Sequence, residues 1–159
     1  MVELELTRRA GDRRLYELAG VGSVRMKGWA SRTAGAEANA HSWEIARRGL
    51  FSRMVEATDE AGKTVGQFRA RGLRRGGTLR WSDRELSLRP ASRWRQRYAL
   101  ADGDRELAVF EGRGRGRRWV RVTLDDPRAL DPGLVLFTAF VVGGLAQDAS
   151  AAAGAAAGT

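Results

Sequence analysis

The sequence predicts one mainly β domain in which about 10–12 short antiparallel strands enclose a hydrophobic C-terminal α-helix. Two observations predict this fold class. Short runs that alternate apolar and polar residues recur along the chain and end at turn-forming residues, and the last run is followed by an uncharged apolar stretch. The length of 159 residues fits a single domain, which we place at residues 1–148.

The alternating runs predict the strands directly. Residues 2–6 alternate valine and leucine with glutamate, and Trp43 and Ile45 share one face of a later run. Turn residues at 59–63 and 102–104 predict two hairpins. The predicted strands are 2–6, 14–18, 24–30, 42–46, 51–58, 64–70, 78–81, 85–89, 95–101, 106–111 and 118–124. Their near-regular spacing is typical of a β-sandwich or a closed barrel.

Two of these hairpins resemble each other in sequence. Residues 52–72 align with residues 94–114 at an offset of 42, which matches Phe68 with Phe110 and Arg71 with Arg113. Two hairpins of the same geometry explain this similarity as well as a duplication does. Both explanations predict that hairpins are the building unit and that antiparallel pairing dominates.

The end of the chain predicts a helix over about residues 132–147. Asp131 is placed to cap it, Pro132 fits its first turn, and residues 134–146 carry no charge. A helix that is apolar on all sides is either buried or in lipid. About 14 residues reach about 21 Å, short of the ~30 Å hydrocarbon layer, so a helix enclosed by the strands is favoured over a membrane span. The strand propensity of residues 135–142 leaves a central strand as an alternative, and the Ala/Gly tail 149–159 is expected to be disordered.

Catalytic and metal-binding residue types are scarce. The chain has no cysteine, which excludes disulfides, thiolate metal sites and cysteine nucleophiles. The single histidine, His41, has no nucleophile motif near it and is expected in a loop or at the start of a strand. Asp125, Asp126 and Asp131 form an acidic cluster that we expect to shape a turn and cap the helix rather than hold calcium. We therefore expect no enzymatic activity, no cofactor and no metal.

Arginine is the residue type that points to a function. The formal net charge is +9, and residues 71–122 alone account for a charge of that size. Such a field attracts phospholipid headgroups, nucleic acid or an acidic protein. The candidate anion-binding residues are Arg71, Arg74, Arg75, Arg93, Arg95, Arg113, Arg115, Arg117 and Arg118. Because the two similar hairpins lie in one meander, we expect the 71–75 and 113–118 loops to share one barrel rim.

Two other interpretations of these arginines stand beside this one. Arginine enrichment with little lysine is typical of GC-rich coding sequence, in which case the rim is only solvated and the tryptophans beside it face the core. The Gly/Arg run at residues 112–118 resembles a phosphate-binding loop. It lacks the lysine and the Ser/Thr of a P-loop and precedes a strand rather than a helix, so it is a weak nucleotide site.

The hairpin repeats and the terminal helix that follows Asp131-Pro132-Gly133 resemble the tubby C-terminal-like superfamily. The most similar members are the small LURP-one-related and phospholipid-scramblase-like proteins. The repeats that carry the resemblance are Asp59, Gly62, Val65-Gly66 and Phe68, and Asp102-Gly103, Leu107 and Phe110. It spans about residues 10–148 and implies a closed barrel of about twelve strands threaded by its own C-terminal helix. It also implies phosphoinositide binding or action at membranes. No lipid-binding motif aligns residue by residue, and the cysteine cluster of animal scramblases has no counterpart.

Three functional hypotheses follow, and none of them is catalytic. The first is a binding module whose arginine rim meets an anionic membrane surface, a phosphoinositide-like ligand or another phosphorylated ligand. The second is a nucleic-acid-binding protein that uses the Arg/Gly-rich segment, and the third is a protein-interaction scaffold. Residues 1–6 do not resemble a secretory signal, so we expect a cytoplasmic protein that is peripheral to the membrane under the first hypothesis.

Overall fold

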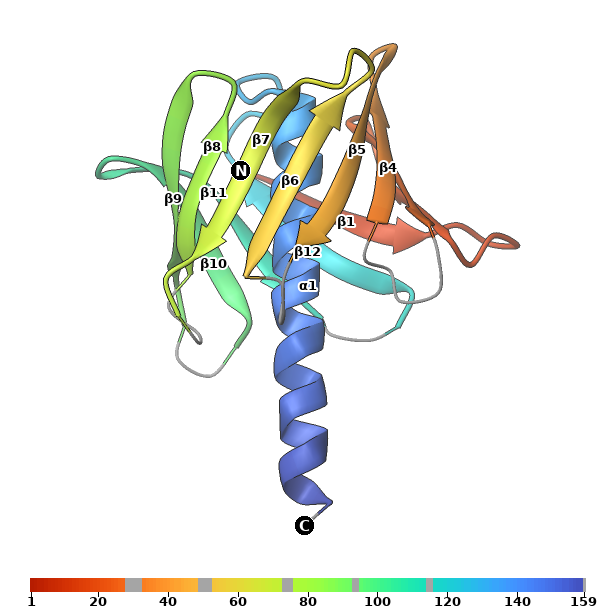
Figure 1. The fold of residues 1–159 in the computed structure, drawn as a ribbon, viewed down its shortest axis with the longest axis vertical. Coiled ribbons are helices and arrows are strands. Elements are labelled where there is room, and N and C mark those ends of the chain that lie inside the picture. Colours follow the sequence, from red (N-terminus) through yellow and green to blue (C-terminus); the bar gives the residue numbers. More distant parts are fainter. Residues whose placement is uncertain (28–32, 49–52, 73–75, 93–94, 114–115, 159) are drawn as a thin grey trace.

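Twelve antiparallel strands close into a barrel around one long helix (Figure 1). The computed structural model describes residues 1–27, 33–48, 53–72, 76–92, 95–113 and 116–158. The strands are β1 (Val2–Arg8), β2 (Leu15–Leu18), β3 (Gly22–Lys27), β4 (Thr33–Ala38), β5 (His41–Arg48), β6 (Met54–Asp59), β7 (Thr64–Ala70), β8 (Gly77–Trp81), β9 (Arg84–Pro90), β10 (Arg97–Asp102), β11 (Arg105–Gly112) and β12 (Arg118–Leu124). The helix α1 covers Pro132–Ala157. The predicted fold class is confirmed.

The barrel is an up-and-down meander that its first and last strands close. Each strand pairs antiparallel with the next one in sequence, and β1 pairs with β12 from Val2 opposite Leu124 to Thr7 opposite Arg118. Closure leaves no strand edge exposed, which removes the usual route by which sheets aggregate. His41 is the first residue of β5, as the sequence predicts.

One strand, β4, is missing from the sequence-based prediction. Its residues, Thr33–Ala38, are mostly alanine and glycine, which favour strands little. The structure places Ala34, Ala36 and Ala38 on the inward face, all buried, and β4 is one of the strands that α1 contacts. Small side chains here leave room for the helix, so β4 is selected by the space available inside the barrel rather than by its own propensity.

The uncharged run of residues 134–146 is helical, although its valines favour a strand. No water reaches the interior of the barrel, so each backbone N–H and C=O of the enclosed segment must find a partner within the protein. A helix satisfies these groups by itself, whereas an enclosed strand would leave both of its edges unpaired. Asp131 Oδ1 accepts a hydrogen bond from Gly133 N at 2.7 Å, and the buried Thr138 hydroxyl donates to Leu134 O at 2.8 Å.

The core lies between α1 and the inward side chains of the wall. Phe137 and Phe140 are fully buried, and burial of a side chain of this size stabilises the fold by about 1.5–3 kcal/mol. Phe140 packs edge-on against Trp119 with ring centroids 5.9 Å apart, and Trp81 packs against Phe137 at 5.6 Å. Trp119 reaches the helix because Gly143 has no side chain at the point of contact.

The helix is longer than the sequence predicts. It continues to Ala157, ten residues past the expected end at residue 147, so residues 149–157 are helical and the expected disordered tail is corrected. Alanine has the highest helix propensity, which accounts for the extension. By length and composition α1 could cross a membrane, but its most apolar part is enclosed by the strands (Figure 1). Residues 150–158 are exposed and project from one end of the barrel (Figure 1).

Candidate functional site: the arginine-rich end of the barrel

The two ends of the barrel are built from different connections. In an up-and-down meander, alternate connections lie at the same end. We call the end where α1 leaves the barrel the exit rim; its described residues between strands are 9–14, 53, 71–72, 76, 91–92, 95–96, 113 and 116–117. The far rim, where α1 begins, comprises the connections at 19–21, 39–40, 60–63, 82–83, 103–104 and 125–131.

Backbone hydrogen bonds join the last residues of three strands to residues of the adjacent exit-rim connections. Gly112 N donates to Gln96 O at 2.8 Å, and Arg8 N donates to Arg117 O at 2.7 Å. Ala70 N donates to Arg53 O at 2.8 Å in the same way. The described residues that bear these arginines are therefore anchored to the ends of the barrel strands.

Charge differs sharply between the two rims. Among the described residues the exit rim carries eight arginines and one acidic residue, Asp12: Arg9, Arg13, Arg14, Arg53, Arg71, Arg95, Arg113 and Arg117. The far rim carries two basic and six acidic residues: Lys63, Arg128, Glu60, Asp83, Asp104, Asp125, Asp126 and Asp131. The barrel thus has a positive end and a negative end.

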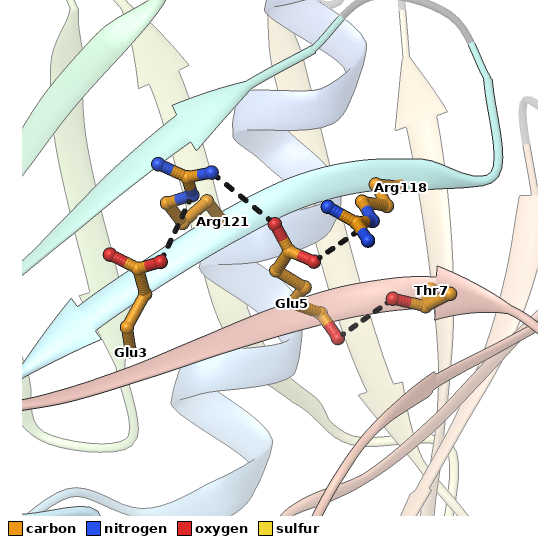
Figure 2. A network of polar contacts seen from close by, with 5 residues as sticks. All are labelled: Glu3, Glu5, Thr7, Arg118 and Arg121. Carbon is orange, nitrogen blue, oxygen red and sulfur yellow. Dashed lines mark hydrogen bonds and ion pairs between the residues drawn. The ribbon is translucent and has the colours of Figure 1, made fainter.

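The wall between the rims is charge-balanced. Arg97, Glu111, Arg121 and Glu5 lie directly opposite one another across β10, β11, β12 and β1, so that signs alternate from strand to strand. Figure 2 shows part of this network, in which Arg121 lies 3.5 Å from Glu5. Opposite charges on facing positions stabilise a sheet by about 0.2–1 kcal/mol per pair. Arg121, which lies close to both Glu3 and Glu5, therefore stabilises the wall.

Most arginines of the exit rim lack such partners. Arg9 lies 3.6 Å from Glu17, and the Arg71 guanidinium donates to Thr78 Oγ1 at 3.3 Å. The other six make no ion pair within the described part of the chain: Arg13, Arg14, Arg53, Arg95, Arg113 and Arg117. All six are exposed, which leaves their guanidinium groups available to an anion.

The structure places the sequence-predicted residues in three groups. Arg71, Arg95, Arg113 and Arg117 lie on the exit rim, which the 71–76 and 113–117 connections share. Arg118 belongs to the wall, where its Nε lies 3.2 Å from Glu5 Oε2 (Figure 2). The remaining candidates, Arg74, Arg75, Arg93 and Arg115, lie outside the described residues.

Sequence reasoning assigned the charge to the segment 71–122, but it missed the N-terminal half of the exit rim. Arg9, Arg13, Arg14 and Arg53 join the rim only through the barrel topology. The predicted strands could not have assigned Arg9, Arg13 and Arg14 to this end, because the missed strand β4 shifts which connections alternate.

One further arginine, Arg47, points inward near the exit. It continues the inward face of Trp43 and Ile45 on β5, and its guanidinium lies 4.7 Å from the centre of the Phe140 ring. A Cβ on Gly144 would lie 2.8 Å from the Arg47 guanidinium carbon. Arg47 therefore contacts the helix itself through a cation–π interaction, which contributes about 0.5–2 kcal/mol. Every second residue of a strand points to the same face, so the spacing between Trp43 and Arg47 could have predicted that Arg47 points inward.

Two surface hollows lie away from the exit rim. One of about 760 Å³ lies at the far rim beside His41 and Glu60, and one of about 630 Å³ lies on the outer wall beside Gly35. A small hollow of about 120 Å³ includes Arg95 and Arg97, but Glu3 and Glu111 also line it. Among the described residues no group of three or more His, Cys, Asp or Glu side chains is arranged to hold a metal. The described arginines of the exit rim come from several connections, which suits an extended ligand.

No model of a known protein family matches the chain, and no curated protein or solved structure is detectably similar to it. The case for a function therefore depends on the distribution of charge over the barrel.

Proposed function

We propose that this chain is a non-catalytic binding barrel that docks through its exit rim on an anionic phospholipid surface. The observation that carries the proposal is the separation of charge between the rims, with eight described arginines at one end and six acidic residues at the other. Arginine enrichment by codon usage alone would place arginines on both rims. Six of the eight described exit-rim arginines also make no ion pair within the described part of the chain, which leaves them available to an anion.

The chemistry of arginine suits phospholipid headgroups. A guanidinium group binds phosphate through two parallel hydrogen bonds, and each basic residue near an anionic membrane contributes about 1 kcal/mol. A ring of such residues engages many headgroups at once, so a flat surface of lipids satisfies it better than one small ligand does.

The architecture supports the resemblance to the tubby C-terminal-like superfamily. A closed barrel with its C-terminal helix threaded through it is the arrangement that the resemblance implies. We extend the proposal accordingly to a cytoplasmic protein that is peripheral to the membrane.

Vesicle co-sedimentation tests the proposal with two variants of equal net charge. The rim variant reverses Arg53, Arg113 and Arg117 to glutamate, and the control variant reverses Lys63, Arg105 and Arg128. The control positions lie at or beside the far rim and are exposed. Vesicles contain phosphatidylcholine alone or phosphatidylcholine with phosphatidylserine or a phosphoinositide.

We expect the native chain and the control variant to sediment with anionic vesicles and the rim variant to bind at least 100-fold more weakly. Removal of three contacts of about 1 kcal/mol each gives that factor. Equal loss in both variants would mean that net charge alone drives binding, and it would overturn the assignment to the exit rim. Binding must also weaken with added salt, because exposed charges are screened within about 8 Å at physiological ionic strength.

Nucleic acid is the second candidate and is addressed in the same experiment. Single-strand binding without sequence preference needs exposed aromatic side chains on which bases stack. Trp119, the described tryptophan nearest the Arg/Gly-rich segment, is 2% exposed and packs on α1, while Trp94 lies outside the described residues. Release of the protein from vesicles by tRNA would favour nucleic acid. Release by a soluble inositol phosphate would indicate a free phosphorylated ligand, and absence of binding would favour a protein-interaction scaffold.

A further inference from the structure

The part of α1 outside the barrel has an unusual composition for an exposed helix. From Ala149 to Gly158 it contains only alanine, glycine and one serine, and residues 150–158 are exposed. Exposed helices ordinarily carry a charged face, which keeps them in water. The eight helical residues from 150 to 157 extend about 12 Å at 1.5 Å per residue. We call residues 150–158 the helix tip.

The helix tip emerges at the centre of the arginine ring. Gly112, the last residue of β11, lies against the helix where it leaves, since a Cβ there would be 2.5 Å from the Ala146 methyl group. The exit-rim connections surround α1 because the barrel is closed. The uncharged helix end therefore leaves the barrel at the end that carries the described exit-rim arginines from both halves of the chain.

An exposed apolar helix end could bind a second copy of the chain, a polar partner or a lipid surface. The arginines at the same end of the barrel favour the lipid surface. A second copy of the chain docked tip to tip would bring two rings of arginine together, and like charges oppose that contact. A polar partner would find methyl groups and a single serine hydroxyl to bind. An anionic bilayer satisfies both features, since its phosphates pair with the arginines and its headgroup–acyl boundary accepts the methyl groups.

We propose that the barrel docks end-on, with its axis across the plane of an anionic bilayer, and that the helix tip enters the interfacial layer. This inference rests on the proposed function. The depth is limited on physical grounds: a tip of about 12 Å does not cross a hydrocarbon layer of about 30 Å. The last four carbonyl groups of the helix also need hydrogen-bond donors, which water and headgroups supply in the interface and hydrocarbon does not.

The cysteine-free sequence makes a direct test simple. Ala153→Cys places one thiol on the helix tip, and Ala61→Cys places one in the exposed turn of the far rim. Each is labelled with an environment-sensitive fluorophore and mixed with phosphatidylserine-containing or pure phosphatidylcholine vesicles, while co-sedimentation is measured on the same samples. We expect a blue shift and protection from aqueous iodide at position 153 only, and only with the anionic vesicles.

The possible results separate the inference from the proposal beneath it. Sedimentation with anionic vesicles and an unchanged signal at position 153 would overturn tip insertion and leave docking of the exit rim standing. Equal shifts at positions 153 and 61 would overturn the end-on orientation. Absence of sedimentation would overturn both. A second variant, Ala153→Glu, should bind more weakly than Ala61→Glu, which changes net charge equally at the other end.

Discussion

Replacement of Gly143 by alanine perturbs the closest contact between the helix and the barrel wall. A Cβ at Gly143 would lie 2.3 Å from Cε2 and 2.4 Å from Cζ2 of Trp119, whereas carbon atoms in contact are ordinarily about 3.5–4.0 Å apart. The indole cannot retreat easily. It is 2% exposed, its ring centroid lies 5.3 Å from that of Tyr16, and Phe140 lies against it on the helix side.

The sign of the effect is opposite to that of an ordinary helix substitution. Glycine to alanine in a helix interior stabilises by about 1 kcal/mol through backbone entropy. Overpacking in a rigid core costs about 1–3 kcal/mol, and here the intruding atom meets a ring that is enclosed on several sides. We expect Gly143→Ala to lower the free energy of unfolding by up to about 2 kcal/mol.

Two other glycines of α1 serve as matched controls. A Cβ at Gly154 meets nothing within 4 Å, so Gly154→Ala should be neutral or should stabilise by up to about 1 kcal/mol. At Gly144 the nearest atom is the guanidinium carbon of Arg47, which belongs to the flexible end of a side chain, so the cost should be intermediate. Urea unfolding followed by far-UV circular dichroism gives all three free energies.

A double-mutant cycle identifies the cause. In a Trp119→Leu background, itself destabilised, the added methyl group at position 143 should cost nothing further, so the two substitutions should couple strongly. If Gly143→Ala proved as stable as Gly154→Ala, or if its cost persisted without the indole, the packing of Trp119 into this gap would be refuted.

Three further predictions concern the cap, the helix tip and one carboxylate. Asp131→Ala should destabilise the fold by about 1 kcal/mol in urea unfolding, because it removes the acceptor for the Gly133 N–H; an unchanged midpoint would mean that Pro132 suffices to start the helix. A chain ending at residue 149 should unfold at the same urea concentration as the full chain, since residues 150–158 are exposed, and lowered stability would show that the tip packs on the barrel. The backbone N–H of Arg14, and then the Arg25 guanidinium 3.0 Å away, hold the pKa of Asp12 below its ordinary value. Its stabilising contribution is therefore present at neutral pH and is lost as pH falls through that lowered pKa. Arg25→Met should raise the Asp12 pKa in an NMR titration, and an unmoved midpoint would leave the backbone as its whole cause.

The strands and the helix were predicted correctly where the pattern of apolar and polar residues matches the burial of those residues in the fold. Alternation, turn residues and a charge-free C-terminal run were enough for a closed β structure around a helix. The strand β4 was missed because inward-facing alanines carry no strand signal, and only the proximity of α1 explains them. The C-terminal end of the helix was placed too early because the alanine-rich tail was expected to be disordered, although alanine is the strongest helix former.

The exit rim was only half predicted, for a different reason. Arg71 and Arg113 were linked by the similarity of two hairpins, which lie close in sequence. Arg53 lies in the first of these hairpins, where it aligns with Arg95, and its place in the repeat was not used. Arg13 lies outside both hairpins, and the closed meander alone brings it to the same end. A charge count along the chain groups residues that are neighbours in sequence. A count over alternate connections of the barrel groups residues that lie at the same end, and these set the charge of a rim.

The position of the core helix at the end of the chain has a consequence for biosynthesis. β1 cannot pair with β12 until β12 has been synthesised. The helix whose side chains fill the interior is synthesised after all twelve strands. Until α1 is released from the ribosome, the growing chain is a series of hairpins whose apolar faces have nothing to cover them. Contacts between residues so far apart in sequence form slowly. We expect a nascent chain of this kind to be most prone to aggregation after its strands are made and before the barrel closes around α1.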